Sequence, residues 1–168
     1  IPTGIKERIE GTKIKTIERR GKFLLINLNN DYIFIIHLGM SGRLLVYNPI
    51  EREKKPLKQK ETGVFFHTIV KLGKHDHIKV DFEDGNQMVF NDVRRFGAID
   101  FIRSAKLVDH KWLSKLGPEP LSNNFSSLVL RKKTENKKCS IKAAILDQEV
   151  VSGIGNIYAC EALWRAKI

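Results

Sequence analysis

The chain has 168 residues, of which 42% are hydrophobic and 29% are charged, proportions typical of a globular protein and not of a disordered or fibrous one. With 30 Lys and Arg against 19 Asp and Glu, the formal net charge is +11. This excess predicts a positive surface that attracts polyanions, with nucleic acid as the first expectation and an anionic membrane surface as the second. The length allows one domain with its own core, or slightly more than one.

The cysteine content and the apolar runs exclude several protein classes. Cys139 and Cys160 lie far apart and form no C-x-x-C pair, which argues against a disulfide framework and against a zinc site within these residues. We therefore expect a reducing, cytoplasmic environment. No apolar run approaches the ~18 residues of a membrane-spanning helix. The start at Ile1 also lacks the basic and apolar segments of a signal peptide.

The first part of the chain, from Thr12 to about Arg103, has short apolar runs separated by turn signals, which predicts an antiparallel β domain. We expect this sheet to have one buried and one solvated face. The expected hairpins pair 22–28 with 32–36 across 29–31, and 78–82 with 87–90 across 83–86. Residues 48–60 are mostly charged and indicate a solvated loop, with DNA binding as the less favoured interpretation.

After residues 116–120 the pattern becomes helical. Ser140 is the expected N-cap of one of these helices. The glycine-rich segment 151–156 is incompatible with regular helix and separates the last helix from the others. That helix reaches Ile168 without a cap, so we expect the chain to be truncated there. The expected helices are 126–133, 140–146 and 157–167.

The turn formed by residues 153–156 has the features of a phosphate site. Gly153 and Gly155 allow a backbone to approach a ligand closely, and the following helix offers free N–H groups and a positive dipole end. Asn156 stands where an N-cap belongs. A simple connection between helices explains the same glycines, but neighbouring lysines favour a surface that follows a DNA backbone. These are Lys132, Lys133, Lys137, Lys138 and Lys142.

Two turns in the β region place apolar side chains beside residues suited to nucleic-acid contact. Arg94 and Arg95 precede Phe96, so a guanidinium can bond to a base edge while the ring inserts between stacked bases. Met40 lies in a glycine-flanked turn, where a flexible apolar side chain can fill the space left by a displaced base. The alternative is that Phe96 and Met40 belong to the core and the arginines to the solvated surface.

Two basic segments have chemical potential of their own. His75 and His77 would share one face of a strand and could ligate a metal. No third ligand is evident, so a hydrogen bond to phosphate or carboxylate is the favoured interpretation. Lys22 follows two arginines whose like charge would lower its pKa and suit it to proton transfer or amine chemistry. The alternative for Lys22 is a solvated strand end.

Six motifs in order along the chain resemble the formamidopyrimidine-DNA glycosylase family. They occupy residues 19–22, 37–42, 74–77, 92–97, 116–121 and 153–159. The resemblance covers nearly the whole chain and implies an α+β fold. It implies an antiparallel two-layered β-sandwich over residues 1–105, followed by a helix–two-turns–helix domain over residues 106–168.

The resemblance also implies a monomeric bifunctional enzyme of base-excision repair that acts on double-stranded DNA. An oxidised purine, formamidopyrimidine or 8-oxoguanine, would be flipped out and cut from its sugar, and the AP site nicked by β,δ-elimination. The family's nucleophile is an N-terminal proline followed by a glutamate. Pro2 follows Ile1 and precedes Thr3, so we expect this chain alone to be inactive. The family's C-terminal finger, with four cysteines and one Zn, is also unmatched.

Individual residues take roles from the resemblance. Lys22 would assist base removal and elimination. The residues that would fill the gap in the duplex are Met40, Arg94 and Phe96, with Arg94 facing the orphaned base. The residues that would contact the DNA backbone are His75, Lys138 and Asn156, with Lys142 and Arg95 as additions and Gly153 and Gly155 as the phosphate turn. A basic insertion from about residue 48 to 73 departs from the family pattern.

Two other functions fit parts of the same sequence. A catalytically inactive homologue would recognise damaged DNA without cutting it, and would differ from the enzyme at its N-terminus. A structural RNA-binding protein of ribosomal type would share the charge, but it leaves the Met40 turn and the Arg94–Phe96 turn unexplained.

Overall fold

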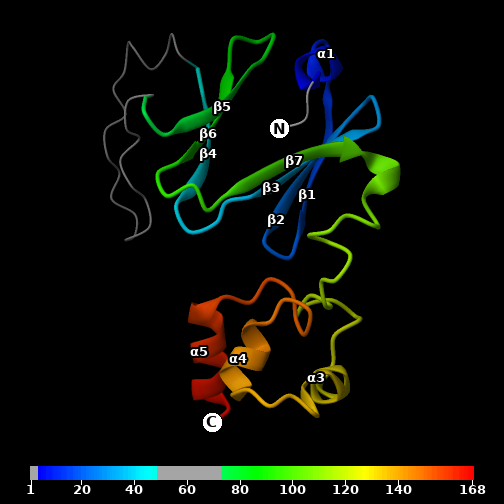
Figure 1. The fold of residues 1–168 in the computed structure, drawn as a ribbon, viewed down its shortest axis with the longest axis vertical. Coiled ribbons are helices and arrows are strands. Elements are labelled where there is room, and N and C mark those ends of the chain that lie inside the picture. Colours follow the sequence, from blue (N-terminus) through cyan, green and yellow to red (C-terminus); the bar gives the residue numbers. More distant parts are fainter. Residues whose placement is uncertain (1–3, 49–72) are drawn as a thin grey trace. The chain divides into compact units, whose positions relative to one another are not determined.

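The computed structural model describes residues 4–48 and 73–168, and its elements are labelled in Figure 1. The start at Ile1-Pro2-Thr3 lies outside the described residues. So do the expected loop 48–60 and insertion 48–73, except for Asn48 and Gly73. The chain divides into two compact units, which are described separately below. The first unit combines Ile1–Ile36 with Ile99–Ile168, and the second is His37–Ala98.

The described strands of the first unit form a four-stranded sheet in the order β1-β2-β3-β7. The expected hairpin of 22–28 with 32–36 is confirmed by strands β2 and β3. The short helix α1 was not predicted, because its five residues carry three charges and too few apolar positions to show a helical period. The bounds are α1 Ile5–Ile9, β1 Ile14–Arg20, β2 Phe23–Leu28, β3 Tyr32–His37 and β7 Ala98–Arg103.

The expectation of one buried and one solvated face is wrong for the middle of this sheet. Four consecutive residues of β3, from Ile33 to Ile36, are at most 7% exposed. Successive side chains of a strand point to opposite faces, so β3 is buried on both. Its unbroken apolar run is the pattern of a doubly covered strand, whereas a half-solvated strand needs alternation. Ile33 and Ile35 pack in one core cluster with Leu25 and, beyond the sheet, Trp112.

The second unit contains a three-stranded antiparallel sheet in the order β4-β6-β5. Burial alternates along β5, as expected for a strand with one solvated face. It does not alternate along β6, where Met88, Val89 and Phe90 are all buried. The turn between β5 and β6 contains Gly85 at φ +80°, the left-handed conformation that glycine adopts readily. The bounds are β4 Gly42–Tyr47, β5 Asp76–Asp81 and β6 Gln87–Asp92.

Helices form the remainder of the first unit and bring the glycine-rich turn against a small core. The expected N-cap is confirmed, because Ser140 Oγ accepts the N–H of Ala143. The core cluster joins Ile145, Val150 and Val151 to Ala159. None of the helices in the described ranges is long and apolar enough to cross a membrane. The bounds are η1 Ser104–Lys106, α3 Ser127–Thr134, α4 Ile141–Leu146 and α5 Asn156–Arg165. Antiparallel sheets with separate helices confirm the α+β class.

Candidate nucleic-acid interface

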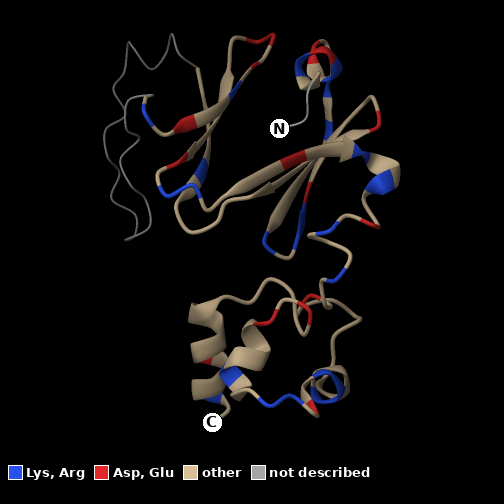
Figure 2. Cartoon of the chain, viewed as in Figure 1, with Lys and Arg blue, Asp and Glu red and all other residues tan. Residues whose placement is uncertain are grey.

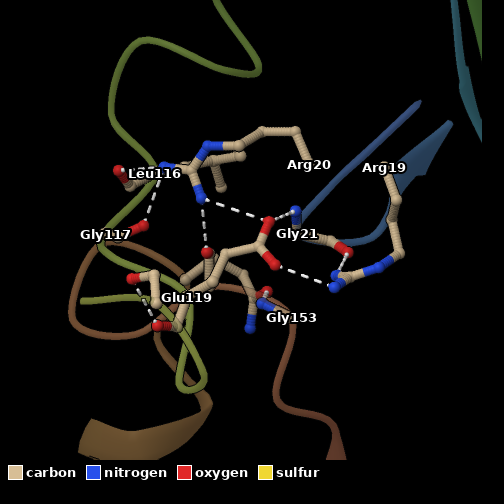
Figure 3. Close-up of polar contacts among 10 residues, drawn as sticks. Arg19, Arg20, Gly21, Leu116, Gly117, Glu119 and Gly153 are labelled. Atoms are coloured by element: carbon tan, nitrogen blue, oxygen red, sulfur yellow. Dashed lines mark hydrogen bonds and ion pairs between the residues drawn. The ribbon is translucent and has the colours of Figure 1, made fainter. Parts of the chain in front are cut away.

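The turn between β1 and β2 is anchored by Glu119, 98 residues away from Gly21 in the sequence (Figure 3). Glu119 Oε1 accepts the N–H of Gly21 at 2.7 Å, and Oε2 accepts a hydrogen bond from Arg19 at 2.8 Å. Arg20 adds an ion pair at 3.6 Å. Burial would raise the pKa of Glu119, but the Gly21 hydrogen bond and the two guanidinium groups outweigh it and lower the pKa. Glu119 therefore stays charged in its partly buried position.

Arg20 extends this anchor to two further segments of the first unit. It donates to Ser152 Oγ at 2.7 Å and to the carbonyl oxygens of Leu116 and Gly117 at 3.0 and 2.8 Å. Ser152 is fully buried, so its hydroxyl depends on this contact. Gly117 is required here, since a Cβ would lie 2.6 Å from the carbonyl oxygen of Glu149. The whole arrangement ties the turn that precedes Lys22 to the segment that leads into the glycine-rich turn.

Lys22 lies in the turn just before β2, directly beside the glycine-rich turn. A Cβ placed on Gly155 would be 3.8 Å from Lys22 Nζ. The pKa of Lys22 is lowered, as expected, but the cause is partial burial. The predicted cause, repulsion from Arg19 and Arg20, is wrong because both guanidinium groups are paired with Glu119. We call Lys22, Gly153, Gly155 and Asn156 the lysine–glycine site.

The glycine-rich turn is held in shape by Gln148. Its side chain accepts the N–H of Gly153 at 2.9 Å and donates to the carbonyl oxygen of Ile154 at 3.0 Å. The N–H of Gly153 is thus already used, and its φ of +88° explains the glycine. Asn156 is not the N-cap of α5: Gly155 is, without a side-chain cap, and Asn156 is the first helical residue. An uncapped N-terminus leaves N–H groups open to an anion.

The five lysines expected to follow a DNA backbone differ in their availability. Figure 2 shows basic residues on α3 and on the connection to α4. Lys133 donates to the carbonyl oxygen of Glu149, and Lys137 forms a 2.8 Å ion pair with Asp147. Lys138 is exposed on the same connection, and Lys142 is half-buried on α4. Lys138 is therefore better placed for an external anion than Lys137, its neighbour.

In the second unit, the structure excludes a core position for the two predicted apolar wedges. Met40, in the turn between β3 and β4, is 74% exposed, and Phe96, in the turn between β6 and β7, is 57% exposed. The guanidinium of Arg94 lies over the Phe96 ring, 4.7 Å from its centroid. This stacking gives the aromatic ring a cationic neighbour on the surface. We call the segments 38–42 and 93–97 the paired turns.

A single carboxylate connects the paired turns. Asp92, 1% exposed, accepts a hydrogen bond from Ser41 Oγ at 2.5 Å and another from the N–H of Gly97 at 2.7 Å. The N–H of Arg94 lies 3.3 Å from the carboxylate and 3.2 Å from Ser41 Oγ. Burial would raise the pKa of Asp92, but the hydroxyl and backbone hydrogen bonds outweigh burial and lower it.

The paired turns also approach each other closely through their backbones. A Cβ on Gly39, whose φ is +62°, would lie 2.6 Å from the carbonyl carbon of Phe96. A Cβ on Gly97 would lie 3.0 Å from the carbonyl oxygen of His37 and 2.6 Å from the Phe90 ring. Arg95 adopts φ +57°, a conformation rare outside glycine. The chain accepts this conformation in a turn where the neighbouring N–H groups are already bonded to Asp92.

The expectation that His75 and His77 share a strand face is wrong. β5 begins at Asp76, so His75 belongs to the preceding turn, and the pairing register shifts between Asp76 and Ile78. His77 Nε2 instead lies 2.8 Å from the carbonyl oxygen of Asp92, and the N–H of Asp92 donates to the carbonyl oxygen of His75. Both histidines are therefore connected to the main chain of the residue that anchors the paired turns.

Metal ligands are not gathered in the described parts of the chain. Within residues 4–48 and 73–168, no group of three or more His, Cys, Asp or Glu side chains could hold a metal ion. Cys139 and Cys160 are both free and exposed. The four-cysteine zinc finger that the family resemblance implies was not expected within these residues, and it stays a prediction for the complete protein.

Several residues that organise these sites were not singled out from the sequence. Asp92 and Glu119 lie inside quoted motifs, but their partners are distant in the chain, so their anchoring role had no local signal. The same holds for Ser41, whose short polar side chain is typical of an ordinary turn residue. Motif position was the only signal for these three residues, and Gln148 lies outside all six motifs.

Comparisons with known proteins identify the family of the chain. Residues 1–99 match the formamidopyrimidine-DNA glycosylase N-terminal domain, and residues 116–168 match the formamidopyrimidine-DNA glycosylase H2TH domain. The formamidopyrimidine-DNA glycosylase of Dinoroseobacter shibae is 42% identical over 168 residues, which are 100% of this chain and 56% of the relative. That of Bartonella tribocorum is 42% identical over 171 aligned residues, covering 99% of this chain and 55% of the relative. The chain thus spans about half the length of these curated relatives.

Solved structures show the same similarity. A crystal structure of the Lactococcus lactis enzyme, non-covalently bound to DNA containing an AP site, has a TM-score of 0.79 and 31% identity. The match covers 98% of this chain and 55% of that one. A complex of the same enzyme with DNA containing FAPY-dG has the same TM-score and identity, covering 98% and 54% of the two chains. On the sequence matches and this shared fold together, the chain belongs to the formamidopyrimidine-DNA glycosylase family.

Proposed function

We propose that the protein carrying this chain removes oxidised purines, formamidopyrimidine and 8-oxoguanine, from double-stranded DNA and cleaves the strand at the resulting AP site. The observation that carries the proposal is the pair of exposed apolar side chains, Met40 and Phe96, on turns joined by a buried carboxylate. Family membership and the DNA lesions named for the solved relatives support it.

The paired turns suit the first physical requirement, removal of a base from the stack. A base inside a duplex is inaccessible, and flipping it requires a few kcal/mol of unstacking and unpairing. Apolar wedges lower this cost by occupying the vacated space and holding the kink open. We assign that role to Met40 and Phe96, and contact with the orphaned base to Arg94, whose guanidinium can bond to a base edge.

The lysine–glycine site suits the second requirement, proton transfer beside a held phosphate. Lys22 has a lowered pKa, so it can exchange a proton more readily than a solvated lysine. Open N–H groups at the start of α5 and the side chain of Asn156 suit a DNA phosphate. In the complete protein, the N-terminal proline amine that the family resemblance implies would attack C1′ of the sugar as the base leaves. The resulting iminium acidifies the adjacent sugar proton, whose removal allows strand cleavage. Further backbone contacts are assigned to His75, Arg95, Lys138 and Lys142.

The test of the wedge uses the complete protein with Met40→Ala and Phe96→Ala. Because both side chains are exposed, truncation should change the melting temperature little, whereas loss of a core Met or Phe costs ~2–5 kcal/mol. Single-turnover excision of 8-oxoguanine from duplex DNA should slow by about tenfold or more. The loss should be partly rescued when the lesion faces an abasic gap. Normal excision together with a large loss of stability would overturn the assignment.

The test of the chemistry uses Lys22→Gln, with Lys106→Gln as control. Lys106 ends η1 in the same unit and takes no part in either site. Lys22→Gln should slow base removal and reduce borohydride-trapped adduct, while Lys106→Gln leaves both unchanged. If the complete protein binds the lesion duplex but neither excises the base nor forms an adduct that borohydride traps, it is instead a damaged-DNA-binding homologue without catalysis.

A further inference from the structure

Asp92 has a buried carboxylate, and among the residues that the structure describes no cation pairs with it. Its partners there are neutral donors: the hydroxyl of Ser41 and the backbone N–H groups of Gly97, Arg94 and Arg95. Burying a charge in this way is costly unless each bond is well made. A position that needed only stability would be served as well by apolar packing. Because burying this charge is energetically unfavourable, the arrangement indicates that Asp92 serves to fix the positions of its hydrogen-bond partners.

Those partners belong to two turns that are distant in sequence. Ser41 lies 51 residues before Asp92 and next to Met40, while Arg94 and Gly97 bracket Phe96 on the other turn. The backbone of Asp92 is held as well, by the carbonyl oxygen of His75 and the ring of His77. Because the backbone of Asp92 is itself held in place, its carboxylate sets the distance between the turn that carries Met40 and the turn that carries Phe96.

We propose that Asp92, acting through Ser41, is a positioning residue that holds the paired turns at the spacing at which Met40 and Phe96 enter a duplex together. The inference rests on the proposed function of those two side chains as wedges. Two wedges fill one vacated base site only if both side chains are correctly placed relative to each other. Misplacement by about 1 Å can slow a reaction by up to about a hundredfold. Gly39 adds to the same constraint, because its backbone lies so close to that of Phe96 that a Cβ would be 2.6 Å from the Phe96 carbonyl carbon.

The experiment measures single-turnover excision and DNA affinity of the complete protein with Ser41→Ala and Asp92→Asn. The control is Asp84→Asn, an exposed aspartate that accepts two hydrogen bonds from Asn86 in the β5–β6 turn of the same unit. Ser41→Ala should slow excision from duplex DNA by about tenfold. DNA affinity should change by less than about twofold, since no phosphate contact is removed. Asp84→Asn should change neither.

The decisive comparison repeats Ser41→Ala in a Met40→Ala/Phe96→Ala background. If Ser41 acts through the wedges, it should have no further effect there, because coupled residues are not additive. An equal slowing in both backgrounds overturns the inference and leaves the wedges intact. A background variant that excises at the normal rate overturns the wedges themselves, and with them the inference. Should Asp92→Asn fail to fold, Ser41→Ala still decides, and normal excision by Ser41→Ala overturns the proposal.

Discussion

Two carboxylates, Glu119 in the first unit and Asp92 in the second, each anchor a tight turn, but they differ in burial and in the charge of their partners. Each accepts the N–H of a glycine in a tight turn, Gly21 and Gly97 respectively, at 2.7 Å. Glu119 is paired with two guanidinium groups and is partly exposed. Asp92 is 1% exposed, and its described partners are neutral donors.

The difference in partners indicates which turn keeps its structure when its anchoring carboxylate is removed. Guanidinium groups that lose Glu119 keep other partners, since Arg19 still donates to Gly21 and Arg20 still donates to the Ser152, Leu116 and Gly117 oxygens. The neutral donors around Asp92 have no such substitute, except that Arg94 retains Ser41. We therefore expect the lysine–glycine site to keep its shape more readily than the paired turns when its anchor is lost.

The largest expected effect comes from removing the two anchors in turn. Asp92→Ala leaves the Ser41 hydroxyl and the backbone N–H groups of Gly97 and Arg95 without their acceptor, each at roughly 1 kcal/mol or more. The free energy of unfolding should therefore fall by about 3 kcal/mol. Glu119→Ala should cost about 1–2 kcal/mol, because mainly the Gly21 N–H is abandoned. Denaturant unfolding of the complete protein measures both. The comparison fails if Glu119→Ala proves the more damaging change.

A smaller effect is expected from pH. The pKa of Asp92 and that of Glu119 are both lowered on folding, so each contributes stability that is present above its ordinary pKa. That contribution is lost as pH falls through the lowered value, in the range below about pH 4. Asp92→Asn, which cannot titrate, should show a shallower loss of unfolding free energy from pH 5 to pH 3 than the unaltered protein. An identical pH dependence would show that the pKa of Asp92 is not lowered on folding.

The smallest effect should come from surface charge outside both anchors. Lys138→Gln should reduce the slope of log K against log salt for duplex binding by about one, uniformly across sequences. Lys137→Gln is the matched control, because its ammonium already pairs with Asp147, and it should change the slope less. Neither should alter the rate of excision at saturating enzyme. Equal slopes for Lys138→Gln and the unaltered protein would remove Lys138 from the interface.

The positions of several elements and of the turns could be predicted from the sequence because their signals are local. Hairpin turns and the Ser140 cap depend on residues within a few positions of one another, and the structure contains them. The order of the motifs indicated the family, which the comparisons confirm. The exposed Met40 and Phe96 were placed on turns for the same reason.

Only the tertiary structure decided how these sites are held. Arg19 and Glu119 are 100 residues apart, and Ser41 and Asp92 are 51 apart, so neither pair leaves a trace in local periodicity. Those contacts change the chemistry: pairing with Glu119 removes the arginines as the cause of the lowered Lys22 pKa and leaves burial in their place. Local pattern specifies which residues occupy a turn, whereas burial and charge pairing depend on what the folded chain brings beside them.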